Sequence, residues 1–205
     1  MSGIAGLVNL DGAPAEQSEI QAMLASMVHR GPDCSRSWRQ EEVALGHLAL
    51  WTTPESCARS YPFVGQGGLC LTADLRLDNQ QELRDLLGLP GAPEEELVLA
   101  AYRRWGPCFP ARLLGDFALA LWDPEQRVMV CARDPFGVRP LVYHRTPRLF
   151  AFASEIRALL CLPRVPRRID EGRVADFLVP LLEGIDQTST FYRDIQQIGR
   201  ASCRE

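Results

Sequence analysis

The first nine residues constrain this chain more than any other segment. Met1 precedes a small residue, Ser2, and a glycine-punctuated apolar run, Gly3–Asn9, follows. Removal of Met1 would leave Ser2 as the chain terminus, with its α-amino group beside its own hydroxyl. Such an amine titrates near ~8, so part of it is neutral at working pH and can accept the side-chain proton. Ser2 is therefore a candidate nucleophile at the start of a predicted buried strand.

Composition limits the class of protein. The 205 residues suffice for one domain with a substantial core, and 46% hydrophobic and 23% charged residues are typical of globular chains. The net charge of −4 argues against nucleic-acid binding. No apolar run approaches the ~18 residues of a membrane-spanning helix. Because no basic segment precedes the first apolar run, a secretory signal is not indicated and we expect a cytoplasmic location.

Cysteine and histidine spacing indicates no metal site. Seven cysteines are spread through the chain without any C-x-x-C pair, so neither a disulfide framework nor a zinc site is predicted. The three histidines are scattered, which favours structural roles. We therefore expect core thiols, and no metal or cofactor held by this segment.

Hydrophobic periodicity predicts an α+β chain. Strands are expected at the apolar runs 3–9, 43–50, 69–77, 117–122, 128–133, 141–145 and 149–153. Helices are expected at 16–28, 79–87, 94–105, 155–160 and 173–182, with Asn79 as an N-cap and Gly88 as a stop. The last four strands are predicted to form an antiparallel meander. Helices that bracket many strands indicate stacked sheets.

Six short motifs occur in an order that resembles one family. They are Ser-Gly-Ile-Ala-Gly at 2–6, His-Arg-Gly-Pro-Asp at 29–33, Leu-Gly-His at 45–47, Leu-Gly-Asp-Phe-Ala at 114–118, Ala-Arg-Asp-Pro-Phe-Gly-Val-Arg-Pro-Leu at 132–141 and Phe-Ala-Ser-Glu-Ile-Arg-Ala-Leu at 152–159. The set resembles the N-terminal class II glutamine amidotransferase domain of the asparagine synthetase family, over about residues 1–197. The resemblance implies a four-layer αββα sandwich of the N-terminal nucleophile hydrolase type.

The resemblance also implies a C-terminal ATP-pyrophosphatase domain that makes an acyl-adenylate. Its Ser-Gly-Gly-x-Asp-Ser phosphate loop does not occur in this sequence, so ATP and Mg²⁺ are expected only on a synthetase domain outside it. We expect that domain to be the partner of this one, acting on a small-molecule or peptide substrate. Residues 198–205 depart from the family and resemble the translation of a sequencing adapter. We therefore expect a truncated protein whose tail, 198–205, is not native and lies exposed without core contacts.

The positions that carry glutamine chemistry in the family differ here. The nucleophilic Cys is Ser2, and the Arg that clamps the glutamine carboxylate is Ala49. The Asn-Gly pair of the oxyanion hole aligns with Asp74 and Leu75, and the Asp that binds the glutamine amino group aligns with Glu94. A methyl group cannot replace a bidentate guanidinium, and an ionised Asp74 would repel a developing oxyanion.

The motifs of the fold are present, whereas the residues of the glutamine site differ from those of the family. Three hypotheses follow. In the first, this is the amidotransferase-type domain of an ATP-dependent amide ligase whose own glutaminase site is inactive, similar to β-lactam synthetases and lasso-peptide macrolactam cyclases. The runs at 76–79, 183–186 and 188–192 favour the cyclases. In the second, Ser2 serves a working glutamine-hydrolysing asparagine synthetase. In the third, the domain is a non-enzymatic scaffold, and a glutaminase assay separates the second hypothesis from the others.

Overall fold

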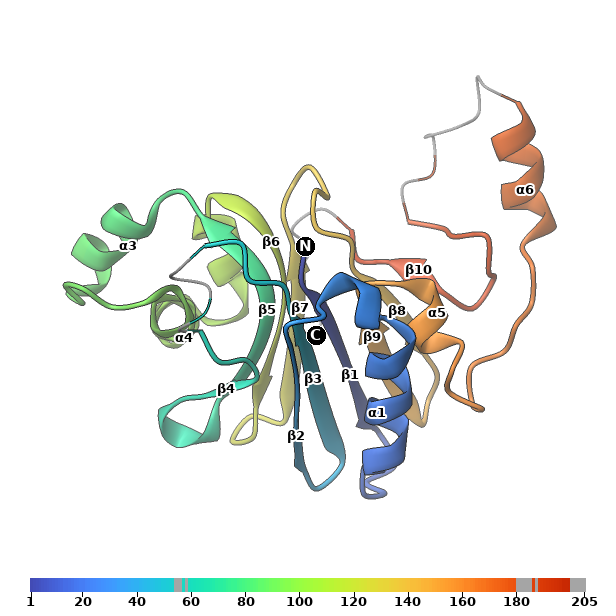
Figure 1. Cartoon of the computed structure of the whole chain (residues 1–205), viewed down its shortest axis with the longest axis horizontal. Helices are drawn as coiled ribbons and strands as arrows, with labels where there is room; N and C mark the ends of the chain where they lie inside the picture. The colour runs from blue at the N-terminus through green and yellow to red at the C-terminus, as the bar shows by residue number, and fades with distance from the viewer. Residues whose placement is uncertain (54–56, 58, 180–185, 187, 200–205) are drawn as a thin grey trace.

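Two antiparallel sheets lie face to face between two layers of helices. The structure, a computed structural model, describes residues 1–53, 57, 59–179, 186 and 188–199. The helices α1 (Gln17–Ser26) and α5 (Ile156–Leu159) cover one sheet, and α3 (Gln80–Leu87) and α4 (Glu94–Trp105) cover the other (Figure 1). This is the expected αββα sandwich. The last helix, α6 (Glu171–Leu178), stands apart from it in Figure 1.

Within the described residues, the larger sheet has six strands and the smaller has four. The larger has the order β10-β8-β9-β1-β3-β2, with bounds β1 Gly3–Asn9, β2 Cys34–Gln40, β3 Val43–Ala49, β8 Val142–Arg145, β9 Leu149–Ala153 and β10 Gln196–Gln197. The smaller has the order β4-β5-β6-β7, with bounds β4 Phe63–Val64, β5 Cys70–Leu77, β6 Gly115–Asp123 and β7 Val128–Arg133. Short 3₁₀ helices occur at Val28–Arg30, Gln66–Gly68 and Gly106–Arg112.

The central strand β1 explains why the opening segment is continuously apolar. All seven of its residues are buried, because it lies inside a four-layer structure. Alternate side chains point to opposite faces, so Ile4 and Val8 pack between the sheets, while Ala5 and Leu7 pack beneath α1 and α5. A strand covered on both faces is apolar along most of its length. Its one polar side chain, Asn9 at the end, donates to the Ala13 and Pro14 carbonyls at 3.0 Å.

The predicted meander is wrong, because its strands divide between the sheets. The hairpin β6–β7 belongs to the smaller sheet and β8–β9 to the larger. The chain crosses between them in a loop that Asp134 organises. Its Oδ1 accepts hydrogen bonds from the amides of Phe136 and Val138 at 3.1 and 3.0 Å, and its Oδ2 accepts one from the Arg139 amide at 3.1 Å. The loop therefore redirects the chain where a hairpin was expected.

Replacing Gly137 in this loop by Val should cost about 1–3 kcal/mol of stability. Gly137 has a φ of 66°, a left-handed backbone conformation that residues with a Cβ disfavour. A Cβ there would also lie 3.2 Å from the Arg133 guanidinium carbon. The midpoint of urea unfolding measures the effect, and an unchanged midpoint would mean that the glycine is incidental.

Several local expectations need correction. The strands β2, β4 and β10 are not predicted by the sequence, and β2 is polar because it forms an exposed edge. Asn79 does not cap α3 with its side chain: its amide group donates to the Arg112 carbonyl and accepts from the Leu114 amide, at 3.0 and 3.1 Å. Gly88 follows α3 with a φ of 69°, as the predicted stop requires. The end of the helix predicted at 173–182 lies outside the described residues.

The tail prediction is wrong for Ile198. Its side chain is only 6% exposed and packs between the sheets, and its amide donates to the Leu141 carbonyl at 2.9 Å. Residues 200–205 lie outside the described part of the chain. The boundary at residue 197 and the non-native origin of the tail stay predictions.

The cysteines are divided between the core and the surface. Cys70 and Cys131 are buried as expected, whereas Cys57, Cys108 and Cys161 are exposed, which corrects the expectation of core thiols for these three.

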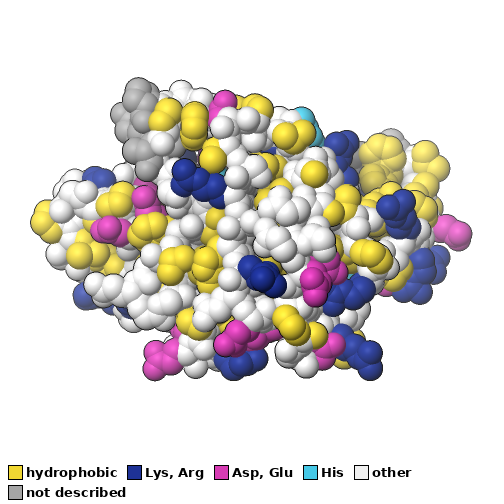
Figure 2. Space-filling view, turned by 60° about the horizontal axis from the view of Figure 1, so that its bottom comes forward, with side chains coloured by type: hydrophobic (Ala, Val, Ile, Leu, Met, Phe, Trp, Pro, Cys, Tyr) yellow, Lys and Arg dark blue, Asp and Glu magenta, His cyan; other side chains and the backbone are white. Residues whose placement is uncertain are grey.

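Figure 2 shows arginines and acidic side chains interspersed over the lower end of the molecule. In the part of the chain that the structure describes, no helix is long and apolar enough to cross a membrane.

Candidate functional site

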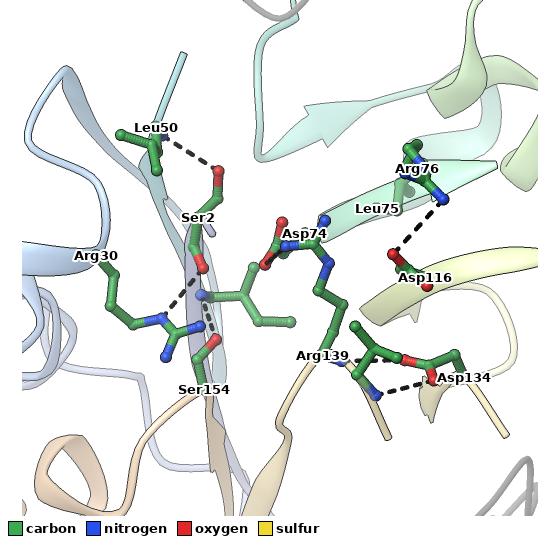
Figure 3. Close-up of polar contacts among 12 residues, drawn as sticks. Ser2, Arg30, Leu50, Asp74, Leu75, Arg76, Asp116, Asp134, Arg139 and Ser154 are labelled. Atoms are coloured by element: carbon green, nitrogen blue, oxygen red, sulfur yellow. Dashed lines mark hydrogen bonds and ion pairs between the residues drawn. The ribbon is translucent and has the colours of Figure 1, made fainter. Parts of the chain in front are cut away.

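Ser2 lies at the start of β1, where three segments meet (Figure 3). Its Oγ accepts a hydrogen bond from the Leu50 amide, just beyond β3, at 3.2 Å. Its carbonyl oxygen accepts one from Nε of Arg30, also at 3.2 Å. The amide of Ile4, the second residue of β1, donates to Oγ of Ser154, which directly follows β9, at 2.9 Å. The predicted nucleophile position is therefore held from several sides.

The segment 29–33 anchors this corner of the site. Arg30 forms an ion pair with Glu155 at 3.1 Å, and His29 contacts the same carboxylate at 2.9 Å. Partial burial would raise the pKa of Glu155, but the hydrogen bonds from His29 and Arg30 outweigh it and hold the pKa below its usual range. Asp33 accepts a hydrogen bond from the Trp51 amide at 2.7 Å. The loop thus fixes both Ser2 and the end of β3.

Ala49 closes β3 and offers only a methyl group to the site. Strand alternation places it on the same face as Leu45 and His47, which is the face toward the smaller sheet. His47 does not compensate for the lost arginine, because burial lowers its pKa to about 4 and leaves the ring neutral. Its ring packs instead against Tyr61, with centroids 5.2 Å apart.

Asp74 comes from β5 and points toward Ser2 (Figure 3). It is 8% exposed, and its Oδ2 lies 3.4 Å from Nη1 of Arg139. Burial raises the pKa of Asp74, while Arg139, the chain's terminal ammonium, Arg30 and a hydrogen bond with the Ser2 backbone act in the opposite direction. A carboxyl group already engaged by a guanidinium therefore occupies the position that the resemblance assigns to the oxyanion donor.

Leu75 turns its side chain away from Ser2. It belongs to the apolar cluster between the smaller sheet and the helices α3 and α4, where it is 7% exposed. Its carbonyl oxygen accepts a hydrogen bond from Nη1 of Arg59 at 3.4 Å. The Leu75 side chain thus belongs to the core, and its carbonyl group contacts Arg59.

Glu94, the first residue of α4, is engaged in contacts of its own. Its Oε1 accepts hydrogen bonds from the Leu77 amide at 2.9 Å and from the Gln80 side chain at 2.7 Å, and its Oε2 lies 2.6 Å from Nη1 of Arg59. The carboxylate is almost fully buried, which raises its pKa, although Leu77 and Arg59 oppose the rise. The structure therefore brings Ser2, Ala49 and Asp74 together, while Glu94 is bound to β5 and Arg59.

Replacing Arg59 by Gln should make stability more sensitive to pH. Because the folded pKa of Glu94 already exceeds the unfolded value of roughly 4.3, its contribution to stability falls as the pH rises through the folded pKa. Loss of Arg59 raises the folded pKa further. The variant should match the wild type below about pH 4 and lose about 2 kcal/mol near pH 7.

Urea unfolding across this pH range measures the Arg59→Gln effect. Adding Glu94→Gln removes the titrating group, so the double variant should lose the extra pH dependence. A deficit of the same size at every pH would contradict the assignment of Arg59 as the counterion of Glu94.

Arg139 and Arg59 are the site residues that sequence reasoning missed. Arg139 lies in the motif at 132–141, but its partner Asp74 is 65 positions away in the chain, so no local pattern links them. Arg59 precedes β4 and carries no motif. Among the described residues, His, Cys, Asp and Glu form no group of three that could hold a metal ion.

The αββα sandwich is the fold of the N-terminal nucleophile hydrolase type. Solved structures agree: the glutamine phosphoribosylpyrophosphate amidotransferase of B. subtilis superposes with a TM-score of 0.62 at 20% identity, covering 78% of this chain and 43% of that one. The model of the glutamine amidotransferase domain family matches residues 1–205. The chain belongs to this family, as a glutamine amidotransferase domain of the asparagine synthetase group.

The curated relatives show the same grouping. Asparagine synthetase [glutamine-hydrolyzing] 3 of Bacillus subtilis is 29% identical over 86% of this chain and 30% of its own length. Asparagine synthetase [glutamine-hydrolyzing] 1 of the same organism is 31% identical over 78% of this chain and 27% of its own length. Amidase chry2 of Gibberella zeae is 30% identical over 72% and 23%. The chain thus spans about a third or less of the length of these relatives.

Proposed function

We propose that this chain is the amidotransferase-type domain of an ATP-dependent amide-bond-forming ligase, and that its own Ser2 site does not hydrolyse glutamine. One observation carries the proposal. Each acidic residue at a glutamine position is ion-paired with an arginine of the chain itself, Asp74 with Arg139 and Glu94 with Arg59.

The site opposes glutamine binding at two points. The glutamine amino group would have to displace Arg59 from a carboxylate that is almost fully buried and held at 2.6 Å. The glutamine carboxylate would meet the Ala49 methyl group and a neutral His47. An unpaired carboxylate in a partly buried site costs several kcal/mol, so glutamine gains no favourable binding mode there.

Ammonia formation has a further obstacle. Hydrolysis of the amide requires donors aimed at the developing oxyanion, and loss of one donor typically costs ~10²–10³ in rate. Asp74 offers a carboxyl group engaged by Arg139 instead of an amide N–H. We therefore infer that the attacking amine of the ligase comes from its substrate, without release of ammonia. The acyl group would be activated with ATP and Mg²⁺ on a synthetase domain outside these residues.

Two measurements test the proposal separately. Isothermal titration of the Met1-processed chain with L-glutamine should give no heat of binding, whereas binding at submillimolar concentration would contradict the account of the site. The gene beyond residue 197 should continue into an open frame with a Ser-Gly-Gly-x-Asp-Ser loop. A stop codon directly after residue 205 would instead favour the scaffold hypothesis.

One observation favours the second candidate, a working glutaminase that uses Ser2. Arg30 lies beside Ser2, and its Nη2 is buried without a hydrogen-bond partner among the described residues. A guanidinium nitrogen in that state can accept an anionic ligand. Glutamine hydrolysis that is lost in Arg30→Gln would establish this alternative.

A further inference from the structure

A cavity lies at the end of the sandwich opposite Ser2. It has a volume of about 620 Å³ and is lined at one side by Val8 and Leu10, at the far end of β1. Ser2 precedes the same strand, so the length of a seven-residue strand, roughly 20 Å, separates the two sites. The cavity is therefore independent of the Ser2 site and of the function proposed for it.

Apolar and aromatic side chains form part of the cavity wall. Trp122, Met129 and Phe150 line it, and all three pack at the edge of the layer between the sheets. The Tyr143 ring, which also lines the cavity, lies 6.0 Å from Phe150 between centroids. Such a wall offers a flat apolar surface to an aromatic or acyl group.

The arginines around this wall outnumber the carboxylates that pair with them. Five line the cavity: Arg127, Arg145, Arg164, Arg168 and Arg193. Three are ion-paired, Arg127 with Glu42, Arg164 with Glu19 and Arg168 with Asp194. Among the described residues, Arg145 forms no ion pair. Nε of Arg193 donates to the Ile169 carbonyl at 3.1 Å, and its charge acts on the Asp194 carboxylate that Arg168 already holds, so the five arginines face only three carboxylates. Two positive charges are thus left for an anion.

A buried ring nitrogen also lacks a partner at this cavity. Nδ1 of His144 lies 2.7 Å from the carbonyl oxygen of Asp194, and because a carbonyl only accepts, Nδ1 is the donor. His144 is 2% exposed, and its Nε2 has no hydrogen-bond partner among the described residues. In the neutral ring, Nε2 is an acceptor that a hydroxyl or amine of a bound molecule would satisfy.

We propose that this cavity binds an organic anion, with its carboxylate or phosphate at Arg145 and Arg193 and its flat apolar body against Trp122 and Phe150. An acidic macromolecule is a poorer fit, because a cavity of about 620 Å³ matches the size of a small molecule. Guanidinium groups bind both carboxylate and phosphate in a bidentate manner. The arginines therefore do not distinguish a carboxylate from a phosphate, and the experiment compares the two head groups.

The test uses 8-anilinonaphthalene-1-sulfonate as a fluorescent anionic probe of the intact chain. We expect one molecule to bind per chain, with an affinity that falls as the ionic strength rises. Arg145→Gln and Arg193→Gln should each weaken binding about fivefold to tenfold, and the double variant should weaken it further. The neutral probe N-phenyl-1-naphthylamine should bind these variants and the wild type equally. Competition by 1-naphthoate against 1-naphthyl phosphate then identifies the preferred head group.

Arg103→Gln is the matched control. Arg103 also donates to a backbone carbonyl, that of Gln66, but it lines a different cavity. This variant should bind the anionic probe like the wild type, whereas Trp122→Leu should weaken both probes. The proposal is overturned if the two cavity arginine variants bind the anionic probe with unchanged affinity, or if Arg103→Gln weakens it as much as they do.

Discussion

A Ser2→Cys variant, freed of Met1, is expected to release no more ammonia from glutamine than the wild-type chain. The substitution restores the thiol nucleophile of the family, which is intrinsically more reactive than a hydroxyl. It leaves Ala49 without a guanidinium and Asp74 paired with Arg139, 3.4 Å away. With no bound glutamine carboxylate and no amide donor for the oxyanion, we expect turnover at least ~10⁴-fold below that of a working site.

Further variants show whether the nucleophile or its surroundings limit hydrolysis. Adding Ala49→Arg and Asp74→Asn to Ser2→Cys should raise the rate of ammonia release, because the clamp and a neutral donor return together. Effects of residues that act as a unit are not additive, so the triple variant is more informative than the separate changes. Robust hydrolysis by Ser2→Cys alone would mean that Ala49 does not mark the carboxylate position.

Gly31→Ala is expected to destabilise the fold by about 3 kcal/mol and to lower the melting temperature by roughly 10 °C. A Cβ at this position would lie 2.3 Å from the carbonyl carbon of Leu48 and 2.7 Å from the amide nitrogen of Ala49. Backbone cannot yield as a flexible side chain does, so the loop 29–33 would have to leave the end of β3. Arg30 would then lose its contact with the Ser2 carbonyl.

Gly3→Ala is the control for this effect. A Cβ at Gly3 would meet side-chain carbons of Arg30 and Leu48 at 3.5 Å, an ordinary contact distance. We therefore expect a change within about 1 kcal/mol. Thermal unfolding followed by circular dichroism compares the two variants, and equal melting temperatures would contradict the role assigned to Gly31.

The elements predicted correctly are those whose residue pattern directly reflects burial or helix ends. The bounds of β1 and α4 agree with prediction, because β1 is apolar from Gly3 to Val8 and α4 has acidic residues in its first turn and arginines in its last. The edge strand β2 escapes prediction, since Ser35, Arg36 and Ser37 carry no alternation of polarity. The last four strands divide between two sheets because of long-range pairing, such as that of β9 with β1. Local periodicity does not predict such pairing.

Apart from Ser2, which the start of the chain already indicates, the candidate site is predictable only through its resemblance to a family. That resemblance selected Ser2, Ala49 and Asp74, which the structure places together, from three different strands or their ends. It also selected Glu94, whose contacts are with Leu77, Gln80 and Arg59. The arginines that neutralise the two acids could not be found this way, because ion pairs between distant segments follow from the folded arrangement.

The Ser2 site is expected not to hydrolyse glutamine, and a comparison of two rates decides this. Ammonia release from L-glutamine is compared between the Met1-processed wild-type chain and Ser2→Ala, at equal concentration and saturating glutamine. We predict equal rates, both at the background of glutamine without protein. A wild-type rate that exceeds that of Ser2→Ala by orders of magnitude would contradict the claim and establish Ser2 as the nucleophile of a working glutaminase.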